Sequence, residues 1–192
     1  MTKIFIIGAG SIGNHLTNAA IKDKYEVYIT DKSNEALYRM KKELFKKRYG
    51  YWSNKIRIIK FNDLDKIYNI EFELVIIGTP PSSHLSLFNF CKKNFKYKKI
   101  MIEKPLAVFN QNFNKLPKKD FVFCGYNHSV SPSFLYLLNL IVKNKEKILF
   151  SSIKWKEGWT GILNAHYWLK DEFSTYLGNI YKGGGAIHEH SH

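Results

Sequence analysis

Three glycines near the start of the chain have the spacing of a phosphate-binding turn. The segment Gly8-Ala9-Gly10-Ser11-Ile12-Gly13 follows a short apolar run and precedes a helical pattern. In such a turn the first glycine permits a tight bend, the second lets the backbone approach a pyrophosphate, and the third lets the helix pack close to a sheet. The first turn of the helix offers free N–H groups and a partial positive charge to phosphate oxygens. The pattern therefore predicts a dinucleotide site.

An acidic residue follows where a dinucleotide-binding unit needs one. Asp31 lies 18 residues after Gly13, at the end of the second predicted strand. A carboxylate there accepts hydrogen bonds from the adenosine ribose and repels a 2′-phosphate, so the sequence favours NAD as cofactor. Lys32 and Ser33 come directly after the acid and leave NADP open. Two alternatives remain: a glycine turn without a ligand, and a methyltransferase, which also combines a glycine-rich loop with an acid after the second strand.

The last five residues of the sequence form a zinc-binding pattern. His188, Glu189 and His192 make a literal HExxH, which on a helix places two imidazoles on one face with a glutamate beside them. Three glycines precede it, and the residues before it lack the apolar period of a buried metalloprotease helix. A zinc hydrolase is therefore a remote alternative, and we assign no metal site.

Aromatic side chains gather in the segment before the glycine triplet. They are Trp159, His166, Tyr167, Trp168 and Tyr176, with Asp171 among them. Sugars stack on such rings, and we assign His166 to a substrate site. Aromatic residues make up 16% of the whole chain, so ordinary packing explains the cluster equally well.

Strands and helices alternate along the first 124 residues. Predicted strands cover residues 3–7, 26–30, 56–61, 74–77, 100–102 and 121–124, and predicted helices cover 15–22, 33–47 and 83–94. The strands are short apolar runs rich in β-branched residues, which is typical of buried strands. This alternation predicts parallel βαβ units, so the fold class is α/β with a doubly wound parallel sheet.

The pattern changes after residue 124. A helix begins at Ser131-Pro132, with the serine as N-cap and the proline in the first helical position. A strand is predicted over 147–155, and residues 159–182 show no clear period. We therefore predict a Rossmann dinucleotide-binding domain at residues 1–123 and the start of a second α/β domain at 124–192. The second part is too short to enclose a core of its own, so we expect exposed apolar surface.

Two predicted strands end in loops that should line one crevice, because ligands bind at the carboxyl ends of parallel strands. These loops are Gly78-Thr79-Pro80-Pro81 and Glu103-Lys104-Pro105. Together with GAGSIG, Asp31, GTPPSSH, EKPLA and a late GGG-x-x-x-E-x-S-H, they resemble the Gfo/Idh/MocA family of nicotinamide-dependent sugar oxidoreductases. The matches follow the family's order from residue 3 to residue 192, and EKP is the most specific of them.

The resemblance implies a site for hydride transfer. It places Lys104 against the reacting hydroxyl or carbonyl oxygen of the substrate, where an ammonium stabilises the charge that develops as the hydride moves. It places Thr79, Pro80 and His84 beside the cofactor. Glu103 would hold a ribose or help to orient Lys104.

The resemblance also gives roles to the C-terminal histidines. Family members carry a glycine triplet and then a helix whose acid and histidine face the substrate. On this basis His192 is the general base, oriented by Glu189 from the same helix face. Many members have the acid four residues before the histidine, where this chain has His188. Asn127 and His128 fall where members contact substrate, and a plain surface histidine cluster is the alternative.

The function implied is hydride transfer between NAD or NADP and a hydroxyl or keto carbon of a sugar, a sugar nucleotide or a cyclitol. An alternative from another class is a chain that binds a dinucleotide without catalysis, because the large antiparallel sheet typical of the family is missing after the glycine triplet. The resemblance implies a homo-oligomer for the full-length form.

Composition limits other classes of function. The chain has 27 lysines but only 3 arginines in a net charge of +14. Proteins that read phosphates favour the bidentate fork of arginine, so we expect no nucleic-acid partner. Cys91 and Cys124 are isolated and form no disulfide framework. No apolar run approaches the ~20 residues that span a bilayer, so we expect a soluble, cytoplasmic protein without a membrane partner.

Overall fold

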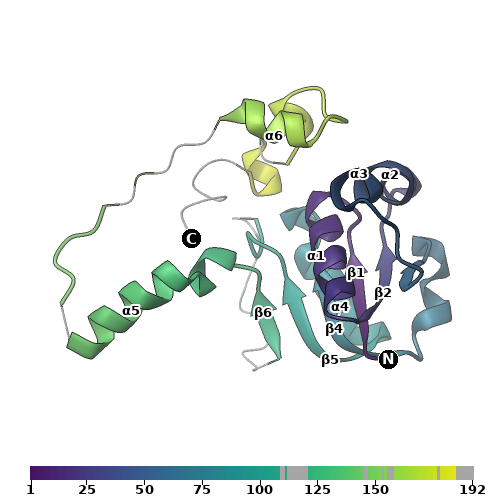
Figure 1. Ribbon diagram of the computed structural model, residues 1–192, viewed down its shortest axis with the longest axis horizontal. Helices are drawn as coiled ribbons and strands as arrows, with labels where there is room; N and C mark the ends of the chain where they lie inside the picture. Colours follow the sequence, from purple (N-terminus) through teal and green to yellow (C-terminus); the bar gives the residue numbers. More distant parts are fainter. Residues whose placement is uncertain are drawn as a thin grey trace.

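A six-stranded parallel sheet forms the centre of the molecule (Figure 1). The computed structural model describes residues 1–108, 111, 121–144, 147–152, 154, 158–176 and 178–184. The strands are β1 (Lys3–Ile7), β2 (Glu26–Thr30), β3 (Ile56–Ile58), β4 (Glu71–Ile77), β5 (Lys96–Ile102) and β6 (Val122–Cys124). Their order is β3-β2-β1-β4-β5-β6, and every neighbouring pair is parallel. The predicted fold class is confirmed, and the strand order reverses direction between β1 and β4.

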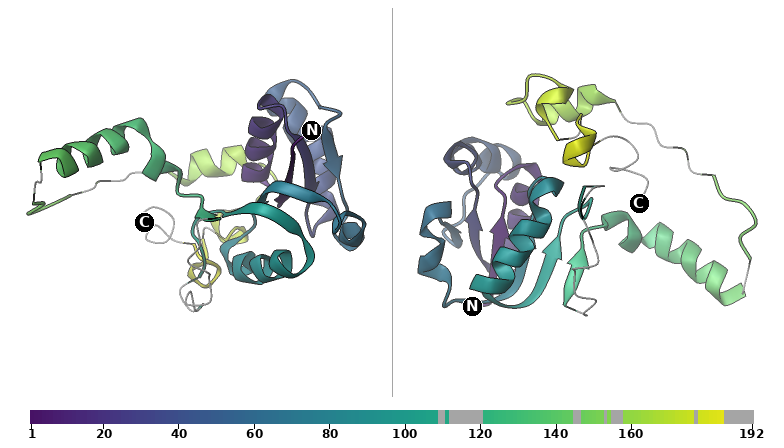
Figure 2. Two further views of the ribbon diagram at one scale, coloured as in Figure 1. Left: turned by 90° about the horizontal axis from the view of Figure 1, so that it is seen from below. Right: turned by 180° about the vertical axis from the view of Figure 1, so that it is seen from behind.

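Helices cover both faces of the sheet (Figure 2). They are α1 (Ser11–Lys22), α2 (Asn34–Arg39), the π-helical η1 (Met40–Leu44), α3 (Phe45–Tyr49), the 3₁₀-helical η2 (Phe61–Ile67) and η3 (Pro81–Ser83), and α4 (His84–Asn94). Alternate residues of β1 face opposite sides: Ile4 and Ile6 pack with α1, α2 and α3, whereas Phe5 and Ile7 pack with η2 and α4. Burial on both faces explains why the strands are apolar along their length.

Two strands begin earlier than the sequence predicts. The amino-terminal half of β4 pairs with that of β5, with Glu71 opposite Lys96, and Lys98 donates a hydrogen bond to Glu73 across 2.7 Å. Charged side chains are tolerated here because the amino ends of both strands reach solvent. They interrupt the apolar pattern from which the strands were predicted. In contrast, β3 has three residues where six were predicted.

The helix predicted over 33–47 runs from Asn34 to Tyr49 through α2, η1 and α3. It ends at Gly50, whose φ of 79° is the left-handed conformation that closes many helices. The 3₁₀ helix η2 was not predicted from the sequence.

After β6 the chain leaves the sheet. The remaining helical segments are η5 (Asn127–Val130), α5 (Pro132–Asn144), α6 (Trp159–Ala165), η6 (Glu172–Ser174) and η7 (Ile180–Lys182). Helix α5 projects away from the sheet and contains no buried residue (Figures 1 and 2). Ser131 caps it as predicted, since its Oγ accepts the N–H of Phe134 at 3.3 Å.

The strand predicted over 147–155 is wrong in the described part of this range. Residues 147–152 and 154 are not in a strand. A strand needs a neighbour for its backbone groups, and none pairs with this segment in the described part of the chain. The division into two domains stays a prediction. No described helix combines the length and the apolar character needed to cross a membrane.

Candidate functional site

The candidate site lies at the carboxyl edge of the sheet, where the loops after β1, β2 and β4 meet. The N–H of Gly8 donates to the Thr30 carbonyl, and the N–H of Gly78 donates to the Ile7 carbonyl, both at 2.8 Å. Because the strand order reverses between β1 and β4, these loops border the place where such sheets bind ligands.

Two glycines of the first loop are required by close packing. Gly8 has a φ of 116°, and a Cβ on it would lie 2.4 Å from the Gly78 carbonyl oxygen. A Cβ on Gly13 would lie 1.9 Å from the carbonyl oxygen of Gly8. Their geometry agrees with the predicted roles, a tight turn and a close approach of α1 to the sheet.

Gly10 is different, because a Cβ there would meet no atom within 4 Å. It is the N-cap of α1, so no side chain at this position competes for the first N–H groups of the helix. The loop thus presents bare backbone and a helix N-terminus to open space, which suits a pyrophosphate.

Asn14 supports this loop and was missed from the sequence. Its buried amide donates to the carbonyl oxygens of Ala9 at 3.1 Å and Gly10 at 2.7 Å. Its position directly after the third glycine, on the first turn of α1, is the sequence signal that could have found it. The amide fixes the part of the loop that glycine leaves conformationally free.

Asp31 joins the end of β2 to the glycine loop. Its Oδ2 accepts the N–H of Ala9 at 2.7 Å, and its Oδ1 accepts the N–H of Ser33 at 2.8 Å. Each carboxylate oxygen has a further lone pair, so both contacts leave capacity for ribose hydroxyls. The neighbouring Lys32 is exposed.

The loop after β4 is held by side-chain hydrogen bonds. The hydroxyls of Thr79 and Ser83 lie 2.7 Å apart, and the Ser83 hydroxyl donates to the Pro80 carbonyl. The ring of His84 is buried, with Nε2 2.6 Å from the Thr79 carbonyl and Nδ1 3.0 Å from the Leu106 carbonyl. Burial lowers the pKa of His84, although these carbonyl oxygens favour its protonated form. Both ring nitrogens thus face backbone carbonyl oxygens.

The Glu103-Lys104-Pro105 turn follows β5, next to β4. The N–H of Glu103 donates to the Ile77 carbonyl at 2.9 Å, and the N–H of Lys104 donates to Glu103 Oε2 at 3.3 Å. Lys104 is half-buried, and the Lys104–Pro105 peptide is cis. A Cβ on Gly125 would lie 2.8 Å from Glu103 Oε1, so this glycine makes room for the carboxylate.

Asn127 and His128 lie in η5, shortly after β6. Both are exposed, and the N–H of Asn127 donates to the Gly125 carbonyl at 3.0 Å. The two residues therefore follow the strand next to β5, at the edge that carries Lys104.

The aromatic segment returns to the nucleotide-binding half of the sheet (Figure 1). The Tyr167 hydroxyl donates to Glu43 Oε2 at 2.5 Å, and the guanidinium of Arg39 lies 4.7 Å from the centre of the Trp168 ring. His166, whose Nδ1 is 2.7 Å from the Ile162 carbonyl, lies between these contacts and α6. The structure thus brings His166 to the helices after β2, whereas Lys104 follows β5.

The start of the glycine triplet reaches the same edge. Gly183 and Gly184 are buried, and a Cβ on Gly183 would lie 2.8 Å from Pro81 and 3.2 Å from Val108. Residues 185–192, which include His188, Glu189 and His192, lie outside the described residues. In the described ranges no three His, Cys, Asp or Glu side chains form a group that could hold a metal ion.

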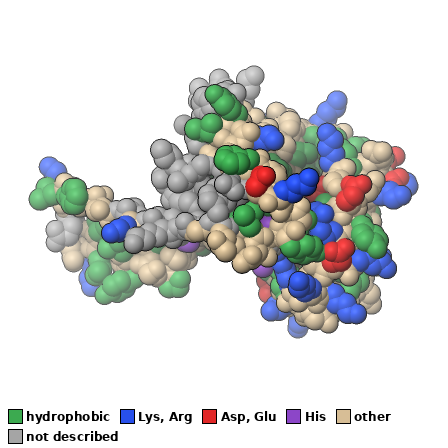
Figure 3. Space-filling view, turned by 90° about the horizontal axis from the view of Figure 1, so that it is seen from above, with side chains coloured by type: hydrophobic (Ala, Val, Ile, Leu, Met, Phe, Trp, Pro, Cys, Tyr) green, Lys and Arg blue, Asp and Glu red, His purple; other side chains and the backbone are tan. Residues whose placement is uncertain are grey.

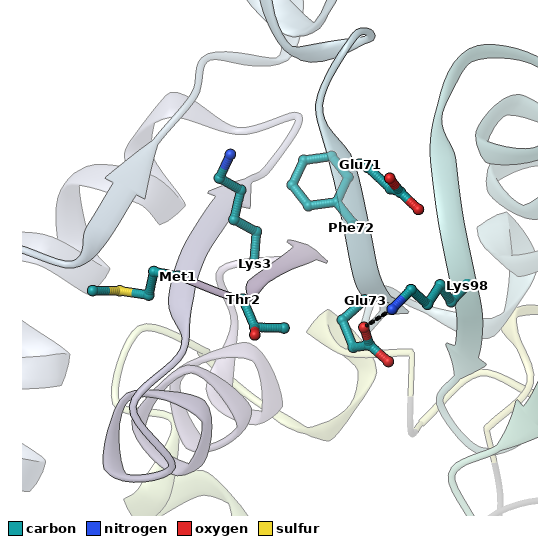
Figure 4. A pocket seen from close by; sticks show the side chains of 7 residues that line it. All are labelled: Met1, Thr2, Lys3, Glu71, Phe72, Glu73 and Lys98. Atoms are coloured by element: carbon teal, nitrogen blue, oxygen red, sulfur yellow. Dashed lines mark hydrogen bonds and ion pairs between the residues drawn. The ribbon is translucent and has the colours of Figure 1, made fainter.

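A pocket of about 400 Å³ lies at the opposite, amino-terminal edge of the sheet (Figure 4). Lys3, Glu71, Glu73 and Lys98 line it with Met1, Thr2 and Phe72. Lys98 and Glu73 form an ion pair, so these two charged side chains of the pocket neutralise each other. The glycine loop, Asp31 and the loops that contain Thr79 and Lys104 lie at the other edge, so we do not assign this pocket to the site.

Comparison with known proteins identifies a family. The sequence model of the Gfo/Idh/MocA family, described as an oxidoreductase family with an NAD-binding Rossmann fold, matches residues 2–118. No curated protein matches the chain.

Solved structures that resemble part of the chain do so at low identity. An NAD binding oxidoreductase from Klebsiella pneumoniae is 16% identical over 74% of this chain and 39% of its own, with a TM-score of 0.48. The WlbA dehydrogenase from Bordetella pertussis, in complex with NADH and UDP-GlcNAcA, is 18% identical over 55% and 30%, with a TM-score of 0.37. The Rex-family repressor RSP is 15% identical over 76% and 62%, with a TM-score of 0.48. The chain thus spans less than two thirds of the length of each.

Proposed function

Because the chain belongs to the Gfo/Idh/MocA oxidoreductase family, with its NAD-binding Rossmann fold, we propose that it transfers a hydride between a nicotinamide dinucleotide and a substrate carbon. The substrate class is a sugar, a sugar nucleotide or a cyclitol, in which a hydroxyl carbon and a keto carbon interconvert. The observation that carries this proposal is the meeting of the Gly8–Gly13 loop, Asp31 and the Lys104 turn at one edge of the sheet.

The residues present fit a dinucleotide. Gly10 leaves open space before the N-terminus of α1, where a pyrophosphate would be held. Asp31 is fixed by two backbone N–H groups and keeps lone pairs for ribose hydroxyls. Its negative charge disfavours a 2′-phosphate, so NAD is the proposed cofactor, with NADP as the competing ligand.

In the oxidative direction a C–H bond of the substrate breaks as hydride, the hydroxyl loses its proton, and a carbonyl forms. The bound nicotinamide supplies the hydride acceptor. The ammonium of Lys104 donates a hydrogen bond to the substrate oxygen and stabilises its developing charge. His192 takes the hydroxyl proton, with Glu189 to orient it. Asn127 and His128 bind further substrate hydroxyls.

Dinucleotide binding without turnover is the second candidate. Helix α5 contains no buried residue, so the region that would complete a substrate pocket has no packed core in the described part of the chain. Binding and turnover therefore have to be measured separately.

Calorimetric titration with NAD and NADP tests the cofactor site. Gly10→Ala should weaken NAD binding about tenfold or more, because the new methyl occupies the approach to the pyrophosphate. Gly161→Ala is the matched control, since its Cβ also meets no atom within 4 Å but lies in α6. Equal NAD affinity in both variants would contradict the assigned site, and tighter binding of NADP than NAD would overturn the cofactor choice.

Turnover with NAD is then followed for glucose, UDP-glucose and myo-inositol. Lys104→Met should lower kcat about 10²-fold with little change in NAD affinity, because it removes one stabilising donor. Lys143→Met, on α5, is the control. Normal turnover in Lys104→Met contradicts the mechanism, and NAD binding without any turnover in the wild type supports the second candidate.

A further inference from the structure

Two adjacent aromatic rings of the second part of the chain are held on the helix that follows β2. The Tyr167 hydroxyl donates to Glu43 Oε2 at 2.5 Å, and Lys47 Nζ lies 5.4 Å from the centre of the Tyr167 ring. The Arg39 guanidinium lies 4.7 Å from the centre of the Trp168 ring. Arg39, Glu43 and Lys47 are four residues apart, so successive turns of α2, η1 and α3 present charges of alternating sign to these rings.

A second contact of the same part of the chain lies on η3, which follows β4. Gly183 is buried there, since a Cβ would lie 2.8 Å from Pro81 Cβ and 3.2 Å from Val108 Cγ1. Gln111 joins the two sides of this contact surface. Its Oε1 accepts the N–H of Val108 at 3.2 Å, and its Nε2 donates to the Ser82 carbonyl at 3.1 Å.

The two contacts lie on opposite sides of the glycine loop. The sheet order is β2-β1-β4, so the Gly8–Gly13 loop after β1 lies between the helix after β2 and η3 after β4. Figures 1 and 2 show α6 and the chain after it at the end of the molecule opposite the N-terminus, which is the end where the strands finish. Residues 166–176 and 178–184, the crossing segment, therefore run past the glycine loop at the carboxyl edge.

The crossing segment leaves room in front of the glycine loop. A Cβ on Gly10 would meet no atom of the described residues within 4 Å, so the place for a pyrophosphate before the N-terminus of α1 is open. The segment is thus anchored on both sides of the dinucleotide site without filling it. This arrangement is that of a cover and not of a blocking element.

We propose that the crossing segment is a strap that closes over the bound dinucleotide, and that Glu43 and Gln111 are the positioning residues that hold its two ends. This inference rests on the proposed dinucleotide site. Neither residue acts on the reacting atoms. The strap retains the cofactor and restricts the access of water to the crevice, as closed lids do in other enzymes.

A strap has a kinetic signature that a directly bound residue lacks. Because it is closed before the dinucleotide binds and after it has bound, it must open for entry and for exit. Loosening one end should therefore raise the association and the dissociation rate constants by a similar factor and leave the Kd within about twofold. Stopped-flow fluorescence of NADH measures both rates, with excess NAD to displace bound NADH.

The first end is tested by Tyr167→Phe, which keeps the ring and removes the hydroxyl. Both rate constants should rise about threefold, the factor expected for one hydrogen bond at a half-exposed position. Glu43→Leu should act in the same way, whereas Glu43→Gln keeps an acceptor oxygen and should stay near the wild-type rates. Tyr136→Phe is the matched control, because it makes the same chemical change on α5.

The second end is tested by Gly183→Ala. The new methyl meets Pro81, and the backbone has a φ of 89° that alanine rarely adopts, so both rate constants should rise about tenfold. Gly50→Ala is the matched control, because Gly50 has a φ of 79° but its Cβ would meet no atom within 4 Å. It imposes similar backbone strain without the contact and should leave both rates within about twofold of the wild type.

Gln111 gives a readout that needs no ligand, because it is the only glutamine in the chain. With glutamine labelled at its side-chain nitrogen, one NH₂ resonance pair reports on the contact surface of Gly183. This pair should shift in Gly183→Ala and stay in place in Gly50→Ala. Gln111→Leu removes both amide hydrogen bonds and should raise the NADH rates about threefold. Asn94→Leu should not, since the Asn94 amide donates to Phe90 within α4.

Several results would overturn the strap. Wild-type rates in both Tyr167→Phe and Gly183→Ala would show that the segment does not close over the dinucleotide. A faster dissociation alone would show a direct contact with the ligand, and a faster association alone would show an obstruction of entry. A fixed Gln111 resonance in Gly183→Ala would remove Gln111 from the proposal.

Failure of the proposed function gives a different result. It appears in the wild type as an absence of NAD and NADH binding by calorimetry, which would remove the strap together with the site. Normal binding of NADH with unchanged rates in the variants would remove the strap alone.

Discussion

Helices α1 and α5 are almost equal in length, with 12 and 13 residues, but only α1 is packed. Helix α1 buries Asn14, Thr17 and Asn18, all polar. Helix α5 is the more apolar of the two, yet Leu135 is 48% exposed and Leu137 is 54% exposed. Burial in this molecule is decided by the presence of a partner surface, not by the hydrophobicity of a helix.

The contrast has a physical cause on each side. At Gly13 the missing side chain lets α1 approach the strand-end backbone. The amide nitrogen of Asn14 donates to two loop carbonyls, whereas Asn14 Oδ1 and Thr17 Oγ1 are buried without a hydrogen-bond partner among the described residues. The small residue lets the helix lie close to the sheet, and the hydrogen bonds of the Asn14 amide nitrogen offset part of the cost of burying polar groups. Helix α5 carries large side chains that meet no covering element in the described part of the chain. Figure 3 shows hydrophobic side chains on the lobe that projects from the body of the molecule.

The largest expected effect contrasts one side chain from each region. Phe72→Ala removes a fully buried ring that packs against Phe5 and Phe95, so the free energy of unfolding should fall by about 3–5 kcal/mol. Leu137→Ala removes a half-exposed side chain from α5, and the change should stay within about 0.5 kcal/mol. Urea unfolding followed by far-UV circular dichroism measures both.

A loss of 2 kcal/mol or more in Leu137→Ala would break the comparison, because a cost of roughly that size marks a buried leucine. Repeating the measurement at several protein concentrations then shows whether a second copy supplies the covering surface.

The pH dependence of the free energy of unfolding extends the comparison to the two cysteines. Burial raises the pKa of Cys91, in α4, to about 12 from its ordinary value of 9.0. The unfolded chain therefore loses this proton first, so the stability that Cys91 provides is complete below pH 9 and declines as the pH rises toward 12. Between pH 8 and pH 10 the free energy of unfolding should fall by about 1.4 kcal/mol on account of this thiol. Cys91→Ala should show a correspondingly smaller fall.

Cys124→Ala is the matched control for the same series. Burial also raises the pKa of Cys124, but this thiol is only half-buried and its hydrogen bond with Tyr126 acts in the opposite direction. Its replacement should change the pH dependence less than that of Cys91. Equal slopes in the wild type and Cys91→Ala would show that Cys91 is accessible to solvent.

The fold was predictable wherever apolar residues were local and continuous. The runs of β1 and β2 are uninterrupted, and both strands were placed to the residue. The amino halves of β4 and β5 were not found, because Glu71, Lys96 and Lys98 stand where an apolar pattern was expected. Charged residues can occupy a strand there because they pair across it and reach solvent.

The site was predictable where backbone geometry demands one residue type. At Gly8 and Gly13 a Cβ would lie too close to neighbouring backbone atoms, so only glycine fits. Such positions can be recognised in the sequence by the residue type alone. The contacts of His84 with Leu106 and of Glu103 with Gly125 join residues that are distant along the chain. No local pattern encodes such pairs, since they exist only after β4, β5 and β6 are placed side by side.

The smallest expected effect concerns two serines, one in each region, that both cap the N-terminus of a helix. The Ser33 hydroxyl accepts the N–H of Ala36 at 3.1 Å and caps α2, which packs on the sheet. The Ser131 hydroxyl accepts the N–H of Phe134 at 3.3 Å and caps α5. Ser33→Ala should lower the free energy of unfolding by about 1 kcal/mol, whereas Ser131→Ala should leave the urea midpoint unchanged.

The reason is that a cap stabilises only the cooperative unit to which its helix belongs. Losing the Ser131 cap should instead speed amide exchange at Phe134 and the next residues of α5, and lower the helical signal slightly. If Ser131→Ala shifted the urea midpoint as much as Ser33→Ala, α5 would unfold together with the sheet. The difference between the two helices would then be one of solvent exposure and not of cooperativity.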